Sequence, residues 1–305
     1  FIRVTVGYVN QRFLINPLSR GAGVTMSLVR ADGLLVVPPN SLGYEGGDEV
    51  EVELFRTPTE LKKTLTIVGS HDLTLDLLGT ALNRIRPGIY VSSSHVGSMG
   101  GINAIKKDQA HVAGIHLFDD ETGEYNAPYI KRFLPEEPVV LVNLTYRTQG
   151  WILPPGNPRG IKEVTDLLQD GVRFINRQRG AGTRLLLDYM LNRSGIDPTQ
   201  IHGYQREEYT HLNVAAAVAA GTADVGLGVF SAAKAYNLDF VPVGEERYDL
   251  LMRKDFYHSP LGQDLMTAIT SPAFKREVES LGGYDLRDVG QIMYEQEVIS
   301  DVEKD

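Results

Sequence analysis

Residues 210–243 read THLNVAAAVAAGTADVGLGVFSAAKAYNLDFVPV and contain the clearest structural pattern in the chain. An alanine-rich segment of helical length, HLNVAAAVAAG, is followed by the short apolar runs DVGLGVF and DFVPVG. Short apolar runs bounded by glycine and polar residues are typical of buried strands, and their alternation with helices is typical of a parallel sheet. The stretch therefore predicts an α/β domain.

The same alternation extends back to residue 64. Strand-like runs are TLTIVGS, GIYVSSS, HVAGIHL and VRFINR, and helix-like segments are LTLDLLGTALNRI, GGINAIKKDQ and TRLLLDYMLNRSG. Two longer segments, PVVLVNLTYRTQGWILPPGNP and LDFVPVGEERYDLLMRKDF, are expected to cross between two halves, and residues 259–293 look helical and return to the first half. We predict a two-lobed domain over 64–305, with lobe one at about 64–142 and 246–305 and lobe two at about 147–242.

The first 57 residues have a different sequence pattern. They contain short strands and glycine turns and end in the alternating EVEVELF, which predicts a small β-rich domain at 1–57. The polar segment TPTELKK at 57–63 is expected to be a linker. Position 1 is Phe and already belongs to a strand-like segment, so we expect this chain to be a piece of a longer polypeptide.

Composition narrows the classes of function. The 305 residues are 42% hydrophobic and 23% charged, as in soluble globular proteins. A net charge of -9 argues against non-specific nucleic-acid binding, and the longest apolar stretches, such as VAAAVAA, are far shorter than the roughly 20 residues of a membrane span. The absence of cysteine excludes disulfides, thiolate metal sites and cysteine nucleophiles.

Helices are predicted to begin beside hydrogen-bond donors at three places. The first strand ends before Ser70, which stands where an N-cap would, with Asp72 in the first turn. Ser98 follows Gly97 and precedes Gly100 and Gly101, and it is expected to cap the second helix. The strand RFIN leads to Arg179, Gly180, Gly182 and Thr183 before LLLDYML. Thr210 or His211 is a fourth, weaker candidate for a cap.

Such helix starts suit a small anion. Helix N-termini offer free N–H groups and partial positive charge, and hydroxyls and arginines add further donors. In an open α/β sheet these starts gather at the carboxyl ends of the strands, where ligands bind. A serine before a helix is, however, more often a plain cap, and a glycine turn with solvated arginines is the alternative for residues 176–184.

Familiar catalytic motifs are missing. GAGTRL and GAGVTM lack the third glycine of a dinucleotide-binding signature, and Val96 occupies the first glycine position of a nucleophile elbow in VGSMG. The seven histidines show no metal-ligand spacing, and His111 and His116 are expected to be ordinary half-buried or surface residues. We therefore predict no catalytic residues and no bound metal cofactor.

Two family resemblances cover nearly the whole chain. The segments GSHDLTLDLL, SSSHVGSMGGINAIKKDQAHVAGIHLFD, NRQRGAGTRLLLDYML and residues 210–243 resemble the periplasmic-binding-protein-like domains of the molybdate and tungstate family, which are related to the effector domains of LysR-type regulators. The stretch RGAGVTMSLVRADGLLVVPPNSLGYEGGDEVEVELF resembles the C-terminal β-domain of MoeA, the gephyrin-related molybdopterin molybdenumtransferase. The resemblances imply an α/β, type II two-lobed fold behind a small β-rich domain.

The first resemblance implies a binding site for molybdate or tungstate in the interlobe cleft. Its ligand contacts are expected at Ser70, Ser98 with the Met99 amide, Arg179, Gly182, Thr183, Thr210 and His211. Arg179 is expected to supply the charge. Asp72 departs from this pattern, because a carboxylate facing a dianion would be repelled, and it either turns outward or indicates a ligand with donors of its own.

The second resemblance implies a cytoplasmic protein of molybdenum cofactor biosynthesis. Its metal-inserting chemistry, and molybdopterin itself, would belong to transferase domains upstream in the same chain, through which a homodimer is possible. This fragment is then expected to sense or deliver the oxyanion without catalysing insertion. The alternatives are a LysR-type sensor of a small organic ligand and the non-catalytic tail of a molybdotransferase. No nucleic-acid or membrane partner is expected for this fragment.

Overall fold

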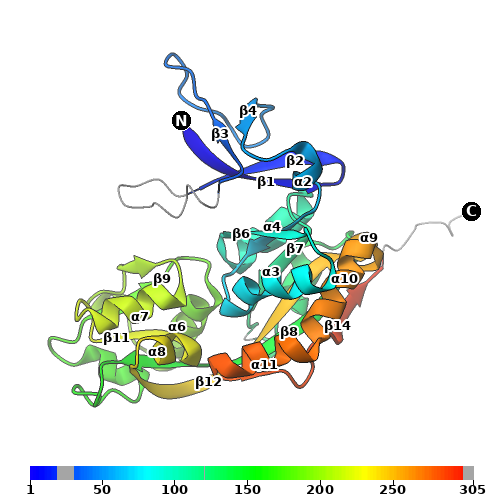
Figure 1. The fold of residues 1–305 in the computed structure, drawn as a ribbon. Helices are drawn as coiled ribbons and strands as arrows, with labels where there is room; N and C mark the ends of the chain where they lie inside the picture. Colours follow the sequence, from blue (N-terminus) through cyan, green and yellow to red (C-terminus); the bar gives the residue numbers. More distant parts are fainter. Residues whose placement is uncertain (19–30, 120, 298–305) are drawn as a thin grey trace, which may run out of the picture.

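A computed structural model describes residues 1–18, 31–119 and 121–297, and Figure 1 shows a small β-sheet joined to a larger two-lobed α/β part. The predicted fold class is confirmed. Residues 19–30, where the MoeA-like stretch begins, and 298–305, the end of predicted lobe one, lie outside the described residues. Among the helices that the structure describes, none combines the length and apolar character of a membrane span.

The N-terminal part is an antiparallel sheet with the strand order β2-β1-β3-β4. Its strands are β1 (Ile2–Val9), β2 (Arg12–Pro17), β3 (Gly33–Leu35) and β4 (Val52–Leu54). Asn10 and Gln11 join β1 to β2 and both have positive φ, at 46° and 62°, which suits the twist of a two-residue hairpin. Alternate residues of β1, Val4 and Val6, form the small core with Leu35 and Leu61.

The segment predicted as a linker contains a short helix, α2 (Pro58–Leu61). Thr57 and Glu60 form a reciprocal capping box, which explains why this polar segment folds. Leu61 is buried in the core of the small sheet. The chain thus passes into the larger domain directly from α2, which is packed on the small sheet.

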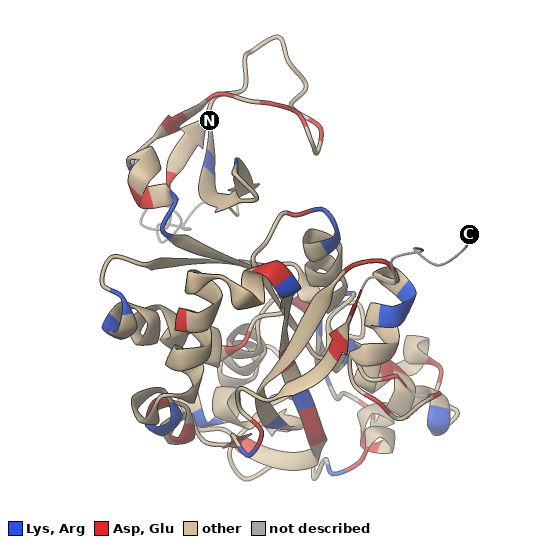
Figure 2. Ribbon diagram, turned by 90° about the vertical axis from the view of Figure 1, so that its right-hand side faces the viewer, with Lys and Arg blue, Asp and Glu red and all other residues tan. Residues whose placement is uncertain are grey.

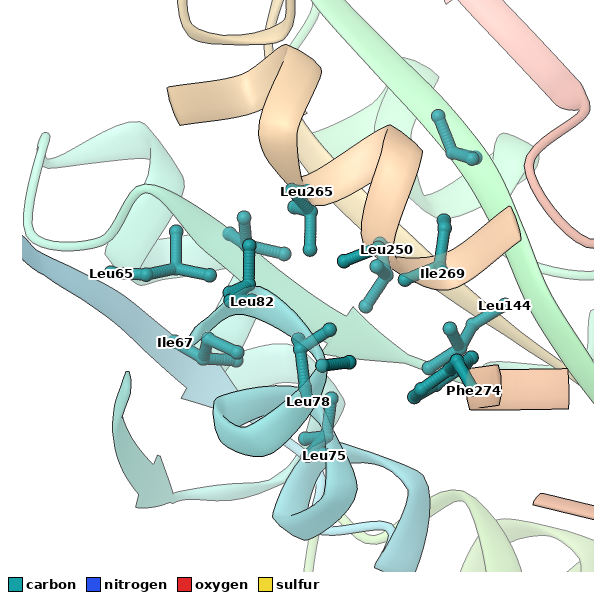
Figure 3. Close-up of a cluster of buried hydrophobic side chains, with 14 of the residues drawn as sticks. Leu65, Ile67, Leu75, Leu78, Leu82, Leu144, Leu250, Leu265, Ile269 and Phe274 are labelled. Atoms are coloured by element: carbon teal, nitrogen blue, oxygen red, sulfur yellow. The ribbon is translucent and has the colours of Figure 1, made fainter. Parts of the chain in front are cut away.

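The first lobe is built on β5 (Thr64–Gly69), β6 (Tyr90–His95) and β7 (Val112–Ile115). β5 pairs in parallel with both β6 and β7, as expected when helices connect the strands. Its helices are α3 (Leu73–Ile85), α4 (Gly97–Lys106), α5 (Ala127–Phe133), α9 (Lys254–His258), α10 (Pro260–Thr270) and α11 (Pro272–Leu281). Figure 3 shows side chains of α3, α10 and β5 meeting in this core, among them Leu78, Leu265 and Ile67.

Two 15-residue strands, β8 (Val139–Leu153) and β12 (Asp239–Arg253), run antiparallel to each other through both lobes. β7 pairs with residues 249–252 of β12, whereas β11 (Val225–Val229) pairs with residues 149–152 of β8. Two register shifts interrupt the β8–β12 ladder, between Pro242 and Gly244 and between Tyr248 and Asp249. The short β13 (Tyr284–Asp285) and β14 (Ile292–Gln296) also pair with β8.

The second lobe contains β9 (Phe174–Arg177), β10 (Glu207–Glu208) and β11, which are parallel neighbours. Its helices are α6 (Gly182–Arg193), α7 (His211–Ala219), α8 (Phe230–Ala235) and the single-turn η1 (Val164–Leu168) and η2 (Pro198–Gln200). The whole sheet has the order β10-β9-β11-β8-β12-β7-β5-β6. Helix α4 follows β6 and helix α6 follows β9, so both begin at carboxyl ends of parallel strands.

Candidate functional site

The four predicted helix starts are present, but two caps differ from the prediction. Asp72, not Ser70, is the N-cap of α3, and its carboxylate accepts a hydrogen bond of 2.8 Å from the Thr74 amide. A carboxylate is the better cap here because it also interacts with the helix dipole. Val96 is the N-cap residue of α4, so Ser98 lies inside that helix. Thr210 does cap α7, since its hydroxyl accepts from the Asn213 amide at 3.1 Å.

Ser70 and Ser98 are brought together by His116. The ring Nε2 of His116 lies 2.7 Å from the Ser70 hydroxyl, and the backbone N–H of His116 donates to the Ser98 hydroxyl at 3.1 Å. Its Nδ1 lies 2.8 Å from a carboxylate oxygen of Glu246 on β12. His116 is 2% exposed, so the prediction of an ordinary half-buried or surface histidine is wrong. It is the centre of a buried polar network.

Burial lowers the pKa of His116, although the carboxylate of Glu246 opposes that shift. A neutral ring with Nδ1–H donating to Glu246 leaves Nε2 to accept from the Ser70 hydroxyl. The network thus has the order hydroxyl, imidazole, carboxylate.

Arg147 joins the crossing strands to the first lobe. Its guanidinium is fully buried, lies 2.6 Å from Asp72 and forms a second ion pair with Glu246, which stands opposite it in the β8–β12 ladder. Acidic and basic residues are interspersed along the ribbon in Figure 2. Burial opposes ionisation of Asp72, but the charge of Arg147 together with the hydrogen bonds from Thr74 and Arg147 outweighs it and holds the pKa of Asp72 below its ordinary value. The Asp72 carboxylate is therefore a partner of Arg147 and does not point outward.

A second arginine in this region, Arg177, is not paired with carboxylates of the described residues as Arg147 is. Arg177, the last residue of β9, is 1% exposed, and its one hydrogen bond from the guanidinium runs to the Tyr209 carbonyl at 3.1 Å. Its Nε and Nη1 have no hydrogen-bond partner among the described residues. Burial and the nearby charge of Arg147 lower the pKa of Arg177 to about 10. This cation is desolvated and lacks a carboxylate partner in the part of the chain that the structure describes.

Other buried polar atoms share this lack of partners. Within residues 1–18, 31–119 and 121–297, no partner is found for the Thr183 hydroxyl or for either ring nitrogen of His211. Thr183 is 1% and His211 2% exposed. The charges of both Arg177 and Arg147 act on His211, which places the three side chains near one another. Buried polar groups without partners are uncommon, and here they point to an absent hydrogen-bonding group.

The starts of α4 and α6 meet at the same place. A Cβ atom at Gly97 would lie 3.1 Å from the Gly180 carbonyl, and one at Gly182 would overlap the ring and carbonyl of His116. Among the described residues, no side chain caps either helix, so their first N–H groups are available to a ligand. The two lobes therefore bring two free helix N-termini beside the Ser70–His116–Glu246 network.

The remaining predicted residues lie differently. The Arg179 side chain is 78% exposed, 3.7 Å from Glu207, and donates to Gln205 at 3.4 Å, so the structure does not bring it to Thr183 and His211. Met99 packs on the apolar cluster beneath α4, which leaves its amide at the helix start. Thr210 uses its hydroxyl for the cap. Arg177 was not predicted, although it ends the predicted strand VRFINR, because the charge was assigned to Arg179 in the glycine turn that follows.

The chemistry of this set favours an anion. Unpartnered guanidinium, hydroxyl and imidazole groups, with two helix N-termini, are donors to acceptor oxygens. Among the described residues, no group of three His, Asp or Glu could hold a metal ion. A surface cavity of about 560 Å³, lined by α3 and β6 residues such as Asn83 and Tyr90, shares none of these side chains.

Comparisons with known proteins agree with the two-part architecture. Residues 79–270 match the PBP superfamily domain, and residues 1–55 match the MoeA C-terminal region (domain IV). The chain is 31% identical to the uncharacterized protein YvgK of Bacillus subtilis (strain 168) over 229 residues, 75% of this chain and 73% of that protein. It is 44% identical over 112 residues, 36% of this chain, to 99% of an uncharacterized protein in the ferredoxin 2Fe-2S gene 5′ region of Clostridium pasteurianum.

Solved structures show the same fold at low identity. A putative phosphate ABC transporter substrate-binding protein from Clostridium perfringens, solved with bound phosphate, aligns with a TM-score of 0.52 at 13% identity, over 72% of this chain and 97% of that one. The regulatory domain of MetR, a LysR family regulator from N. meningitidis, aligns with a TM-score of 0.51 at 13% identity, over 73% and 97%. Transport receptors and regulators thus share this architecture.

Proposed function

The chain belongs to the PBP superfamily, and from that membership we propose that it binds a small oxyanion, molybdate or tungstate, between its two lobes. The observation that carries the proposal is Arg177, a buried cation with two nitrogens that have no partner among the described residues, whose charge acts on the equally unpartnered His211. The unpartnered Thr183 lies in the first turn of α6, the helix that follows the strand ending at Arg177. An oxyanion would supply the missing charge and the missing acceptors together.

The fused MoeA domain IV is the reason for choosing these two ions. A binding domain on the same chain as part of a molybdopterin metal-insertion enzyme places its ligand at high effective concentration near that enzyme. We propose that the domain senses the oxyanion or delivers it to metal insertion. The transferase chemistry itself would belong to domains outside residues 1–305.

The proposed ligand contacts revise the predicted set at two positions, Arg179 and Thr210. Arg177 replaces Arg179 as the source of charge, and Gly182, Thr183 and His211 of the second lobe remain. From the first lobe, the start of α4 offers the amides of Ser98 and Met99, and the Ser70 hydroxyl can turn from His116 to the ligand. Thr210 contributes by capping α7 and so fixing His211.

Calorimetry with molybdate, tungstate, sulfate and phosphate tests the proposal. We expect molybdate and tungstate to bind, and Arg177→Gln to weaken binding on the order of 100-fold, because a buried charge-assisted contact is lost. Arg179→Gln is the matched control, two residues away and exposed, and should change affinity less than about threefold. Absence of heat with all four anions, or equal effects of the two variants, would contradict the proposal.

A second candidate function rests on the Ser70–His116–Glu246 geometry, which has the hydrogen-bond order of a nucleophilic triad. In that role Ser70 would attack an ester carbonyl while His116 takes its proton. It ranks second because Ser70 is 2% exposed and any substrate would need open lobes. Labelling by a fluorophosphonate probe that is lost in Ser70→Ala would support it, and absence of labelling would exclude it.

A further inference from the structure

The buried charges beside the proposed anion site already sum to zero. Around it, the buried Arg147 and Arg177 carry two positive charges, and Asp72 and Glu246, the two buried carboxylates that pair with Arg147, carry two negative ones. This inference rests on the proposed function, because a bound dianion would add two negative charges to a neutral, desolvated site. Uncompensated buried charge is costly, so the site would bind a dianion better if it gained a positive charge.

Two histidines are close enough to respond to that charge, and they differ in their partners. His116 has a partner for each ring nitrogen, Ser70 and Glu246, in the structure as it stands. His211 is equally buried, yet neither ring nitrogen has a partner in the described part of the chain. A neutral imidazole carries only one N–H, whereas a protonated ring can donate from both nitrogens.

The surroundings of His211 disfavour a proton while the site is empty. Burial lowers its pKa first, and the nearby positive charges of Arg177 and Arg147 lower it further. The remaining charged or titratable groups around it, on the elements packed against α7 and across the lobes, are Glu207, Glu208, Lys234, His116 and His71. The two carboxylates have partners of their own, since Glu207 pairs with Arg184 and Glu208 accepts from Asn213 at 3.1 Å. Lys234 donates to the Ser280 carbonyl.

We propose that the site takes up one proton with each dianion that it binds, and that His211 receives it. The bound anion would differ from the carboxylates near His211, because its negative charge is not already paired with a cation. Linkage then requires that anion binding favours protonation and that protonation favours anion binding, by the same factor. The ligand is thus a dianionic oxyanion, and the proton on His211 offsets one of the two negative charges that it brings into the site.

Tungstate and perrhenate separate this proposal from simple anion binding, because both are tetrahedral oxometallates of similar size and differ by one charge. Calorimetry at pH 6.5 in two buffers of different ionisation enthalpy measures the protons taken up. We expect about one proton per tungstate and none per perrhenate. Between the pKa of His211 in the bound protein and its pKa in the free protein, tungstate affinity should rise about tenfold for each unit by which the pH is lowered. Perrhenate affinity should not change with pH over the same range.

His211→Gln supplies the residue-level test, with His202→Gln as the control because His202 is exposed on the same lobe. We expect His211→Gln to abolish proton uptake on tungstate binding and to flatten the dependence of tungstate affinity on pH. Tungstate binding without proton uptake, or uptake that persists in His211→Gln, would overturn this inference and leave the proposed function standing. Absence of binding by every anion would instead overturn the proposed function.

Discussion

Arg147 is the residue on which the buried charges between the lobes depend. Its guanidinium is fully buried and pairs with Asp72 and Glu246. Removing one partner of a buried ion pair costs about 3–5 kcal/mol, because the remaining charge stays buried without compensation. We expect Arg147→Met to lower the free energy of unfolding by about this amount at pH 7, as measured by urea denaturation.

The pH dependence of this loss identifies its cause. In the wild type, the pKa of Asp72 and that of Glu246 lie below their ordinary values, because Arg147, with help from Thr74 at Asp72 and from His116 at Glu246, outweighs the cost of burial. Stability is therefore lost as pH falls through those lowered values. Without Arg147, the same carboxylates favour protonation, so the variant gains stability as pH falls. The deficit should therefore shrink between pH 7 and pH 5. Arg179→Met, at an exposed site, should change stability by less than about 0.5 kcal/mol, and a deficit that grows on acidification would contradict this account.

His111 makes the junction between the two domains sensitive to pH. Its Nδ1 accepts from the Thr66 amide at 3.0 Å, and the backbone of Tyr8 in the small sheet is its second partner. Burial lowers the pKa of His111 to about 4 from the ordinary 6.5. Because the folded pKa is the lower one, the stabilisation is fully present above pH 6.5 and is lost as pH falls toward 4.

We expect the wild type to lose on the order of 2 kcal/mol of unfolding free energy between pH 7 and pH 4.5 that His111→Gln does not lose. Urea denaturation at a series of pH values measures both proteins. His202→Gln, at an exposed position, should follow the wild-type curve. If the unfolding free energy of His111→Gln falls with pH in parallel with that of the wild type, other groups cause the loss of stability.

Single residues of the site were only partly predictable from the sequence. Ser70, Ser98 and Thr183 follow from strand and helix patterns, because helix starts gather at the carboxyl ends of parallel strands. Arg177 and Arg179 are two residues apart, and the sequence does not show that the first is buried at the end of a strand while the second is exposed in the turn. The choice between Ser70 and Asp72 as a cap also depended on a distant partner, Arg147, which the local pattern does not contain.

At the scale of elements, helix α6 packs one face against the first lobe. Gly182, Leu185 and Tyr189 follow the spacing of a helix face, and each contacts the first lobe: Gly182 meets His116, Leu185 packs on the cluster beneath α4, and the Tyr189 ring lies 5.8 Å from that of Phe118. The helix that would offer amides to the anion is thus also the surface through which the lobes touch.

Gly182→Ala should therefore hold the lobes apart. The added methyl group would overlap His116, whereas alanine within α6 itself is favoured over glycine by about 1 kcal/mol. We expect the thermal stability of the variant to be kept, its tungstate affinity to fall at least about tenfold, and its radius of gyration by small-angle X-ray scattering to stay large at saturating tungstate.

Gly79→Ala is the matched control, because Gly79 lies in helix α3, where a Cβ would make only an ordinary contact of 3.9 Å with Val91. It should bind and compact like the wild type. If Gly182→Ala also compacts normally, the contact with His116 does not limit closure.

The order of elements was predictable from local pattern, but their pairing was not. Alternating strand and helix patterns identify β5, β6, β7, β9 and β11 because each element is local in sequence, whereas the two-residue β10 was not predicted. Arg147, Glu246 and His116 come together only through the β8–β12 ladder and the position of β7, which join segments about 100 residues apart. The short helix α2 was missed because its capping box lies in a polar segment that also contains a proline.

At the scale of the whole molecule, the small sheet is attached to the first lobe. Gly7 packs so closely on Thr66 that a Cβ would overlap it, the Arg56 guanidinium lies 3.9 Å from the centre of the Tyr90 ring, and His111 contacts the Tyr8 backbone. All three contacts involve residues of β5 to β7 or their flanks. We infer that the small domain moves with the first lobe when the second lobe closes on an anion.

Distances between spin labels test this inference, and the absence of cysteine from the sequence lets each engineered pair be labelled uniquely. Exposed positions for Glu53→Cys, Lys106→Cys and Asn192→Cys lie in the small sheet, in α4 of the first lobe and in α6 of the second. Saturating tungstate should leave the 53–106 distance unchanged, because packed contacts fix those domains, and should shift both distances to 192. The same pairs carrying Gly182→Ala serve as the control and should show no shift. A change in the 53–106 distance on binding would mean that the small domain moves independently, and a linker rather than the packed junction would then govern how the anion reaches the MoeA part of the protein.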